Sequence, residues 1–560
     1  MPPANKQRVS NALPKVPEQF LEQLREDIVS RRLDHGFQCL DAHREVFEAC
    51  APGVKSAAAL LGYLAQWVDM GYARPDFIKK ILKRFSGLSR DQLPLIEYVQ
   101  LQMAEGLVAM SEEEFAAAVR RFQNVLALQD EIQDKQMVSI AYFWMGRCLR
   151  RQGRYDDSLG YVAKAREMAL QLGYLKMVAV MRVLEAWIAF QEGHPDNAAT
   201  LLGEAESVLT ETDDYVTRGN ISSAYGRISR RQGNYDQALA RFGQAIEEYK
   251  KRDPYNRNLA RSYVNIAFVK RLLAVQLREK MDMDAARLRR KKSGKPLAKS
   301  APSKMSERER LSHLRAEAFE HLVQARVIYD RYDDHRGNGN VSITYGYLYL
   351  DEGELQRAAE VGATAYRLGE EKKDSVLKSR ARILQSTVEC QKFEEQIEEG
   401  SSGASSTQRA CEYAREAVAS ALNTQNRRLI AKAHIALGLA LCLDFSGDFE
   451  TARKCADDAD ALLNPASHDY VWKELQELRK KLRGVGSINS TLREWSQGIV
   501  GRKTFQEVTE EFAAIVIPKV WRREGCKVAR VAAKLSVSPK KVRRILRSQG
   551  LLAGSNGSAR

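Results

Sequence analysis

Three stretches of the chain, residues 145–165, 225–245 and 345–365, repeat one pattern of small residues. In each stretch a first glycine is followed by a second glycine after seven residues, by a small residue after twelve and by alanine after nineteen. The copies are Gly146, Gly153, Ser158, Ala165; Gly226, Gly233, Ala238, Ala245; and Gly346, Gly353, Ala358, Ala365. A further copy places Ala186, Gly193, Ala198 and Ala205 at the same offsets. Such a period constrains the chain to build an array of repeated units.

These offsets indicate pairs of antiparallel helices. Small residues let two helices approach closely, and the second glycine ends the first helix in the turn. The pattern resembles the tetratricopeptide repeat, although the step of 40 residues between copies exceeds the ~34 residues usual in that family. The resemblance implies a helical solenoid whose inner groove, lined by the first helix of each repeat, binds a protein, a peptide or a small ligand.

Asn220, Asn265 and Asn340 fall on predicted first helices, which line the groove of such an array. An asparagine amide both donates and accepts hydrogen bonds, so these side chains are candidate contacts for a peptide backbone. The alternative is that all three are ordinary solvated polar residues.

The segment from Cys526 to Leu552 predicts two short helices joined by a tight turn. Ser538 is a helix cap, and Pro539 fits the first helical position because no N–H is needed there. The inward faces of the two helices are apolar: Val528, Val531, Ala532 and Leu535, then Val542, Ile545 and Leu546. The outward face of the second helix is left to five cations: Lys540, Lys541, Arg543, Arg544 and Arg547.

Residues 504–552 resemble the Fis-type helix-turn-helix, through Gly525, Ala529, Ala532, Ala533, Leu535, Val537, Ser538, Val542, Leu546 and Gly550. The chain departs from that family at Ser536, where glycine is usual, and a positive φ there would cost serine about 1 kcal/mol. The resemblance implies a domain that binds duplex DNA with its second helix in the major groove. The residues expected to contact bases or phosphates are Ser538, Lys540, Lys541, Arg543, Arg544 and Arg547. The alternative is a terminal helical hairpin with a solvated basic face.

The net charge of +16 is concentrated in two segments. Residues 501–560 hold 14 Lys and Arg against 4 Asp and Glu, and residues 287–304 hold 8 Lys and Arg with no acid. The second segment contains Arg287, Arg289, Arg290, Lys291 and Lys292, and its composition predicts a disordered insertion. We interpret it either as a solvated loop or as an auxiliary clamp for DNA phosphates.

Composition and motifs exclude several classes of protein. The eight cysteines are scattered without a CxxC pair, which is typical of free thiols in a reducing compartment. The longest apolar run, Ile435–Leu443, is far shorter than the ~18 residues needed to span a bilayer. The N-terminus lacks the apolar stretch of a signal peptide. No metal-binding or nucleotide-binding spacing and no hydrolase elbow is found, so no enzyme activity, catalytic residue, metal or cofactor is expected.

The predicted fold class is all-α: a TPR-like solenoid followed by a small helix-turn-helix domain. Two segments interrupt the predicted array, a basic disordered insertion at about 283–307 and a Gly/Ser insertion at about 397–407. Residues 15–93 are either a cap or degenerate repeats. The predicted order is a disordered N-terminus (1–14), an N-terminal helical region (15–93), the solenoid (94–483), a linker (484–503), the helix-turn-helix domain (504–552) and a disordered tail (553–560).

A helix predicted from Thr504 to about Val520 carries an apolar stripe of Phe505, Val508, Phe512, Ile515 and Val516. In the family that this region resembles, the preceding helices build a dimer, which implies a homodimer through residues 504–520. The alternative is that the stripe docks on the last repeat.

The sequence favours a cytoplasmic transcription regulator, nucleoid-associated when DNA-bound. Its array senses a partner or ligand, and its C-terminal module binds duplex DNA. The rival hypothesis is a non-catalytic interaction scaffold whose basic tail contacts RNA, lipid or an acidic partner.

Overall fold

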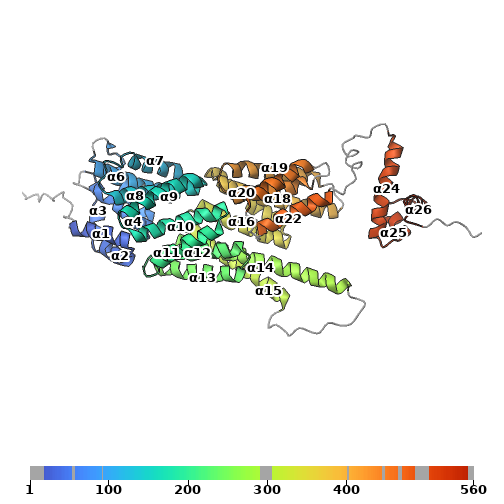
Figure 1. Ribbon diagram of the computed structural model, residues 1–560, viewed down its shortest axis with the longest axis horizontal. Coiled ribbons are helices and arrows are strands. Elements are labelled where there is room, and N and C mark those ends of the chain that lie inside the picture. The colour runs from blue at the N-terminus through green and yellow to red at the C-terminus, as the bar shows by residue number, and fades with distance from the viewer. Residues whose placement is uncertain are drawn as a thin grey trace, which may run out of the picture.

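The computed structural model describes residues 18–52, 57–90, 93–290, 306–399, 403–443, 448–463, 470–485 and 503–552. All regular secondary structure in these residues is helical, which confirms the predicted all-α fold class. The helices form a long solenoid, and a small three-helix unit stands apart at its C-terminal end (Figure 1). None of the described helices is long and apolar enough to cross a membrane.

The N-terminal region covers the first repeat. Its helices are α1 (Glu18–Ser30), α2 (Leu33–Ala42), α3 (Arg44–Glu48), α4 (Leu61–Asp69) and α5 (Pro75–Leu82), with short 3-10 helices at Ala57–Leu60 and Lys83–Phe85. Trp67 is fully buried, and Gly36 leaves room for its ring. The apolar side chains of this region share one continuous core with the helices that follow as far as Leu184. The helices of residues 18–85 therefore pack as one body with the first repeats of the solenoid.

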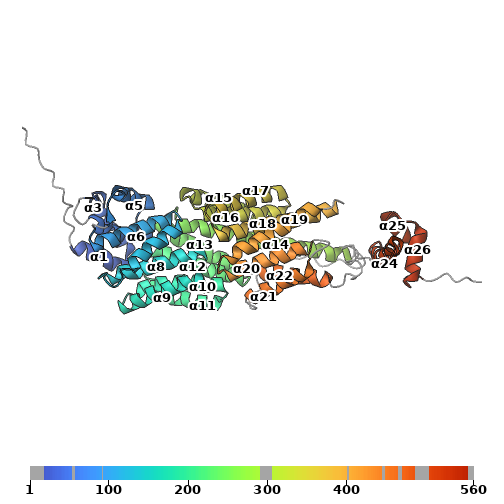
Figure 2. The same cartoon turned by 90° about the horizontal axis from the view of Figure 1, so that it is seen from above.

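The solenoid consists of paired helices, seen from two directions in Figures 1 and 2. The pairs are α6 (Leu95–Ser111) with α7 (Phe115–Leu126), α8 (Lys135–Gln152) with α9 (Tyr155–Gln171), α10 (Leu175–Glu192) with α11 (Pro195–Leu209), α12 (Tyr215–Arg231) with α13 (Tyr235–Arg252), α14 (Arg257–Arg290) with α15 (Glu307–Arg331), α16 (His335–Glu352) with α17 (Leu355–Glu371), α18 (Ser375–Glu398) with α19 (Ala404–Leu422), and α20 (Arg427–Leu441) with α21 (Phe449–Leu462). α22 (Tyr470–Val485) packs on the last pair.

The repeated small residues act as the sequence predicts. The second glycine of each copy ends the first helix with positive φ: Gly153 (84°), Gly193 (97°), Gly233 (80°) and Gly353 (81°). The small residues at the next two offsets, from Ser158 and Ala165 to Ala358 and Ala365, are all fully buried. At Gly226 an added Cβ would lie 2.7 Å from the ring of Phe242, so the close approach of α12 and α13 requires glycine.

The coil closes on itself through a buried cluster of charges. The carboxylate of Glu113, between α6 and α7, pairs with Arg151, Arg257 and His335. His335 also lies 3.2 Å from Asp374, before α18. Burial alone would lower the pKa of His335, but its hydrogen bonds to these two carboxylates raise it above its ordinary value. The cluster joins residues from five of the helix pairs of the solenoid.

Two predicted insertions are shorter than expected. α14 continues to Arg290, so Arg287, Arg289 and Arg290 have a helical backbone, because residues 281–290 contain only residues compatible with a helix and neither glycine nor proline. Ser306 caps α15, and its hydroxyl accepts a hydrogen bond from the Glu309 N–H. Lys291 and Lys292 lie outside the described residues, as do 1–17, 400–402, 486–502 and 553–560, which hold the predicted termini and most of the predicted linker.

The C-terminal unit is formed by α24 (Phe505–Arg523), α25 (Val528–Lys534) and α26 (Pro539–Ser548). Its core contains Ile517, Val531, Ala532, Val542, Ile545 and Leu546, with partly buried neighbours drawn only from residues 513–552. The unit therefore has a hydrophobic centre separate from that of the solenoid. In both views it lies beyond the last repeat (Figures 1 and 2).

Candidate functional site

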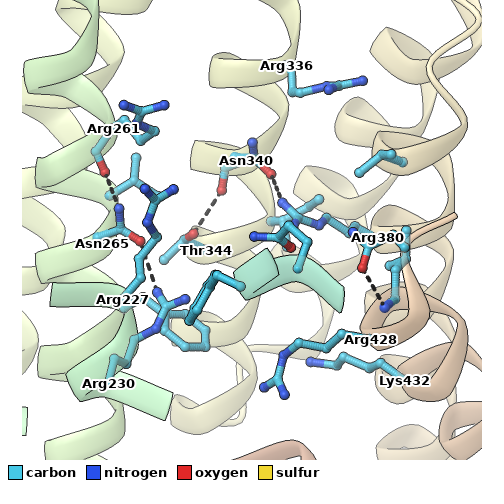
Figure 3. A pocket seen from close by; sticks show the side chains of 18 of the residues that line it. Arg227, Arg230, Arg261, Asn265, Arg336, Asn340, Thr344, Arg380, Arg428 and Lys432 are labelled. Atoms are coloured by element: carbon cyan, nitrogen blue, oxygen red, sulfur yellow. Dashed lines mark hydrogen bonds between the residues drawn. The ribbon is translucent and has the colours of Figure 1, made fainter. Parts of the chain in front are cut away.

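A groove within the solenoid encloses a cavity of about 320 Å3. It is lined by α8, α10, α12, α14, α16, α18 and α20, the first helices of seven consecutive repeats, together with a few residues of neighbouring elements. None of its described lining residues is Asp or Glu, whereas ten are cations: Arg150, Arg151, Arg227, Arg230, Arg231, Arg261, Arg336, Arg380, Arg428 and Lys432. Figure 3 shows how seven of these cations gather around the opening.

Some of these cations have carboxylate partners behind the wall of the groove. Arg151 pairs with Glu113, Arg336 lies 2.5 Å from Asp374, and Lys432 lies 3.7 Å from Glu474. By contrast, Arg150, Arg227, Arg261 and Arg380 have no carboxylate within 4.0 Å in the part of the chain that the structure describes. The groove therefore carries uncompensated positive charge.

Like-charge repulsion adds to the cost of burying these guanidinium groups. Burial and the neighbouring charge of Arg261 lower the pKa of Arg227 to about 9. Burial, followed by the charges of Arg151 and Arg261, lowers the pKa of Arg150 well below its ordinary value. The Nε atoms of Arg150, Arg227 and Arg261 are buried and have no hydrogen-bond partner within the described residues. A buried cation without a partner destabilises a protein unless a ligand compensates it.

Two of the predicted groove asparagines orient arginines. The Asn265 Oδ1 accepts a hydrogen bond of 2.9 Å from Arg230, and the Asn340 Oδ1 accepts one of 2.9 Å from Arg380 (Figure 3). Asn220 is not one of the lining residues, and its oxygen accepts hydrogen bonds from Tyr249 and Arg261. The side-chain oxygens that were candidates for a peptide backbone are thus already engaged.

Aromatic rings form much of the remaining wall. The guanidinium of Arg150 lies 4.5 Å from the ring centroid of Trp187, and that of Arg230 lies 5.2 Å from Phe268. Lys432 lies 4.7 Å from the ring of Tyr470. Stacked on rings in this way, the cations keep a fixed plane while the edge of each guanidinium can donate to a ligand.

Sequence reasoning did not identify the arginines of this groove, although one signal was present. Counted from the first glycine of a copy, the fourth and fifth residues are arginines in two copies, Arg150 and Arg151 and then Arg230 and Arg231. Equal offsets in two repeats place side chains on the same face of successive helices. The repeated pair of arginines therefore indicates a charged inner surface.

The second candidate site is α26 in the C-terminal unit. Ser536 has a φ of 49°, the Val537 N–H donates to the Ala532 carbonyl and the Ser536 N–H donates to the Ala533 carbonyl. These bonds form a Schellman turn, which sharply separates α25 from α26. The hydroxyl of Ser538 accepts a hydrogen bond of 3.2 Å from the Lys541 N–H, so it caps α26 as the sequence predicts.

The cations of α26 divide into two groups. Lys540, Arg543 and Arg547 are exposed, and none has a carboxylate within 4.0 Å in the described residues. Lys541 and Arg544, predicted to be available to DNA, instead pair with Glu510 of α24, at 3.5 and 2.5 Å. No local pattern in the sequence indicates this pairing, because the partner lies 34 residues from Arg544.

The predicted apolar stripe of α24 lies outside the core of the unit, which takes Ile517 from this helix instead. Phe505 is 87% exposed and Phe512 is 49% exposed, and Val508, Ile515 and Val516 are half-buried. Pro518 lies within the helix, which continues to Arg523, three residues beyond the predicted end. The N-terminal half of the stripe therefore lacks cover from its own unit.

Asp27, His35 and Cys39 bring three groups of metal-ligand chemistry within 4.8 Å of one another near the N-terminus. His35 Nδ1 lies 2.7 Å from Asp27, and Arg32 lies 3.0 Å from the other carboxylate oxygen. Protein partners account for both oxygens of Asp27, so the cluster is explained as a packed ion pair.

Comparison with known proteins agrees with the helical architecture. Residues 103–169 match the tetratricopeptide repeat family model. The comparison with curated protein sequences finds no match. Within the described residues the protein is an all-α protein with TPR-like repeats, and the paired helices continue well beyond the matched segment.

Solved structures provide looser likenesses. A Rap protein complexed with competence and sporulation factor has 12% identity and a TM-score of 0.49, over 72% of this chain and 98% of that one. A human IFIT1 dimer with m7Gppp-AAAA has 13% identity and a TM-score of 0.41, over 84% and 94%. A signal-transduction ATPase of the STAND class with a tetratricopeptide repeat sensor, from Pyrococcus horikoshii, has 13% identity and a TM-score of 0.35, over 86% and 68%.

Proposed function

We propose that this chain is a non-catalytic, DNA-binding regulator in which the solenoid takes up a partner or ligand and α26 binds duplex DNA. The observation that carries the proposal is the exposed basic face of α26, held by its own core behind a sharp turn. The N-terminus of α26, capped by Ser538, carries a partial positive charge that favours a phosphate. Arg543 is suited to reach base edges, and Arg547 to contact the backbone.

The proposal is tested with the double variant Arg543→Ala with Arg547→Ala. DNA fragments selected by the full-length protein from a random pool serve as probes, and affinity is measured by fluorescence anisotropy across a salt series. Removing two exposed side chains should leave melting unchanged. We expect the affinity for the selected fragments to fall by at least about tenfold, because each good base contact contributes about 1–3 kcal/mol.

A matched control removes the same charge from α24 of the same unit. Lys519 and Arg522 are exposed there, and Lys519→Ala with Arg522→Ala should weaken the binding of all sequences modestly and equally. Equal losses in the two double variants, with no preference for selected over random DNA, would favour the interaction scaffold with a basic tail.

We also propose that the exposed half of α24 joins two copies of the chain. A helix-turn-helix unit reads few base pairs, so pairing two half-sites supplies the specificity that one unit lacks. Phe505 and Phe512 then form the centre of a symmetric contact. Phe505→Ala with Phe512→Ala should shift the sedimentation coefficient from dimer to monomer and lower DNA affinity, whereas Thr509→Ala, exposed on the same helix, should not. A wild-type chain that sediments as a monomer at all concentrations removes this part of the proposal.

A further inference from the structure

The groove of the solenoid has the composition of an anion-binding site. Four of its arginines lack a carboxylate partner in the described chain, and three of these have a buried Nε atom without a hydrogen-bond partner. Burying cations in this way destabilises the empty protein. A bound anion would supply the missing negative charge and would stabilise the folded protein.

The guanidinium groups are held in place before any ligand arrives. Asn265 fixes Arg230 and Asn340 fixes Arg380, each through a 2.9 Å hydrogen bond. Arg150 is stacked on Trp187. Fixed donors lose little conformational entropy when they bind, and two parallel N–H groups of one guanidinium match two oxygens of one phosphate.

The size of the cavity decides between kinds of anion. A volume of about 320 Å3 lies within the range of small-molecule sites, about 300–1,000 Å3, and is far too small for a DNA duplex. Four of the ten cations around that volume lack a carboxylate partner within the described residues, which favours several negative charges on a compact molecule. Planar guanidinium groups and aromatic rings in the same wall offer stacking surfaces for a flat heterocycle.

We propose that the groove binds a nucleotide-sized ligand that carries two or more phosphate groups. The phosphates lie against Arg150, Arg227 and Arg261, whose mutual repulsion they relieve, and the heterocycle stacks on the aromatic side of the cavity. The proposal deepens the sensing role in the proposed function, and its test measures ligand binding without DNA.

The first experiment uses the full-length protein with ATP, GTP, inorganic tripolyphosphate and AMP as probes, at low salt. Binding is followed by titration calorimetry and by the melting temperature. We expect ATP and GTP to raise the melting temperature by several degrees, to bind at least as tightly as tripolyphosphate, and to bind about tenfold or more tightly than AMP. Failure of every triphosphate to bind overturns the proposal, as does tighter binding of heptaglutamate or of oligothymidine than of any nucleotide.

The second experiment neutralises the groove with Arg150→Gln and Arg227→Gln. Ligand affinity should fall by about tenfold or more, while the melting temperature of the empty protein stays constant or rises because repulsion is removed. A purely structural role for these arginines predicts the opposite change in melting. Unchanged affinity in this variant overturns the proposal. If the double variant fails to fold, the single variant Arg227→Gln carries the same test.

The control removes two exposed arginines from outer helices, with Arg120→Gln in α7 and Arg453→Gln in α21. This change lowers the net charge equally and should alter affinity by less than about twofold. An equal loss in the control means that only the overall charge attracts the probe, and refutes the site. The probes are also measured on the variant of α26 that is deficient in DNA binding, so failure of DNA binding and failure of ligand binding are read separately.

Discussion

Replacing Ser536 by glycine should stabilise the C-terminal unit. Ser536 has a φ of 49°, its side chain is exposed, and it makes no side-chain hydrogen bond within the described residues. A non-glycine residue in this left-handed conformation costs about 1–2 kcal/mol. Glycine in turn loses about 0.5–1 kcal/mol more conformational entropy on folding. The net gain in the free energy of unfolding is therefore about 0.5–1 kcal/mol.

Hydrogen exchange measures this gain within the full-length chain. In peptides that span α25 and α26, amides that exchange only when the unit unfolds should exchange about two- to fivefold more slowly, since about 1.4 kcal/mol corresponds to a factor of ten. The exchange rates of peptides from the solenoid should be unchanged, because the C-terminal unit and the solenoid have separate cores. DNA affinity should also be unchanged, because Ser536 precedes the basic face.

The matched control places glycine three residues earlier. Ala533 is exposed in the last turn of α25, where the backbone is helical, so Ala533→Gly should accelerate exchange by about two- to fivefold. Slower exchange in Ser536→Gly together with faster exchange in Ala533→Gly identifies the left-handed turn. Faster exchange in Ser536→Gly would refute the turn and, with it, the separation of α25 from α26.

Three further predictions concern other parts of the molecule. Gly226→Ala should lower the free energy of unfolding by about 1–3 kcal/mol, because the added Cβ would press on Phe242. Gly243 faces open space in the next helix, so Gly243→Ala should raise the free energy of unfolding by about 0.5–1 kcal/mol. Urea unfolding followed by circular dichroism measures both changes. His335→Gln should reduce the melting temperature most below pH 6.5. The folded-state pKa of His335 is raised, so the stabilisation by the charged imidazole is lost as the pH rises through that pKa. A difference in melting temperature between variant and wild type that stays constant across pH 5–9 would contradict this. Glu510→Gln should increase DNA affinity about two- to fivefold at low salt by releasing two cations of α26, and unchanged anisotropy titrations would show that the pair does not compete with DNA.

The sequence determined the repeating units of this protein. The helix pairs and their glycine turns follow from contacts between residues fewer than twenty positions apart, and a period of small residues records such contacts directly. The same is true of α25 and α26, where Ser538, Pro539 and the apolar face predict the start and the inward side of the helix. At Ser536 the sequence indicated only the cost that a positive φ would have, and the structure has that φ.

The tertiary structure alone decided what the repeats enclose. The curvature of the coil brings Arg336 within hydrogen-bond distance of the backbone carbonyl of Arg151, 185 residues earlier. It gathers arginines from six helices around one cavity that contains no carboxylate among its described lining residues. Each of these arginines, read in its own helix, looks like a solvated surface cation. Their common position depends on small rotations between successive repeats, and no local pattern in the sequence records the sum of those rotations.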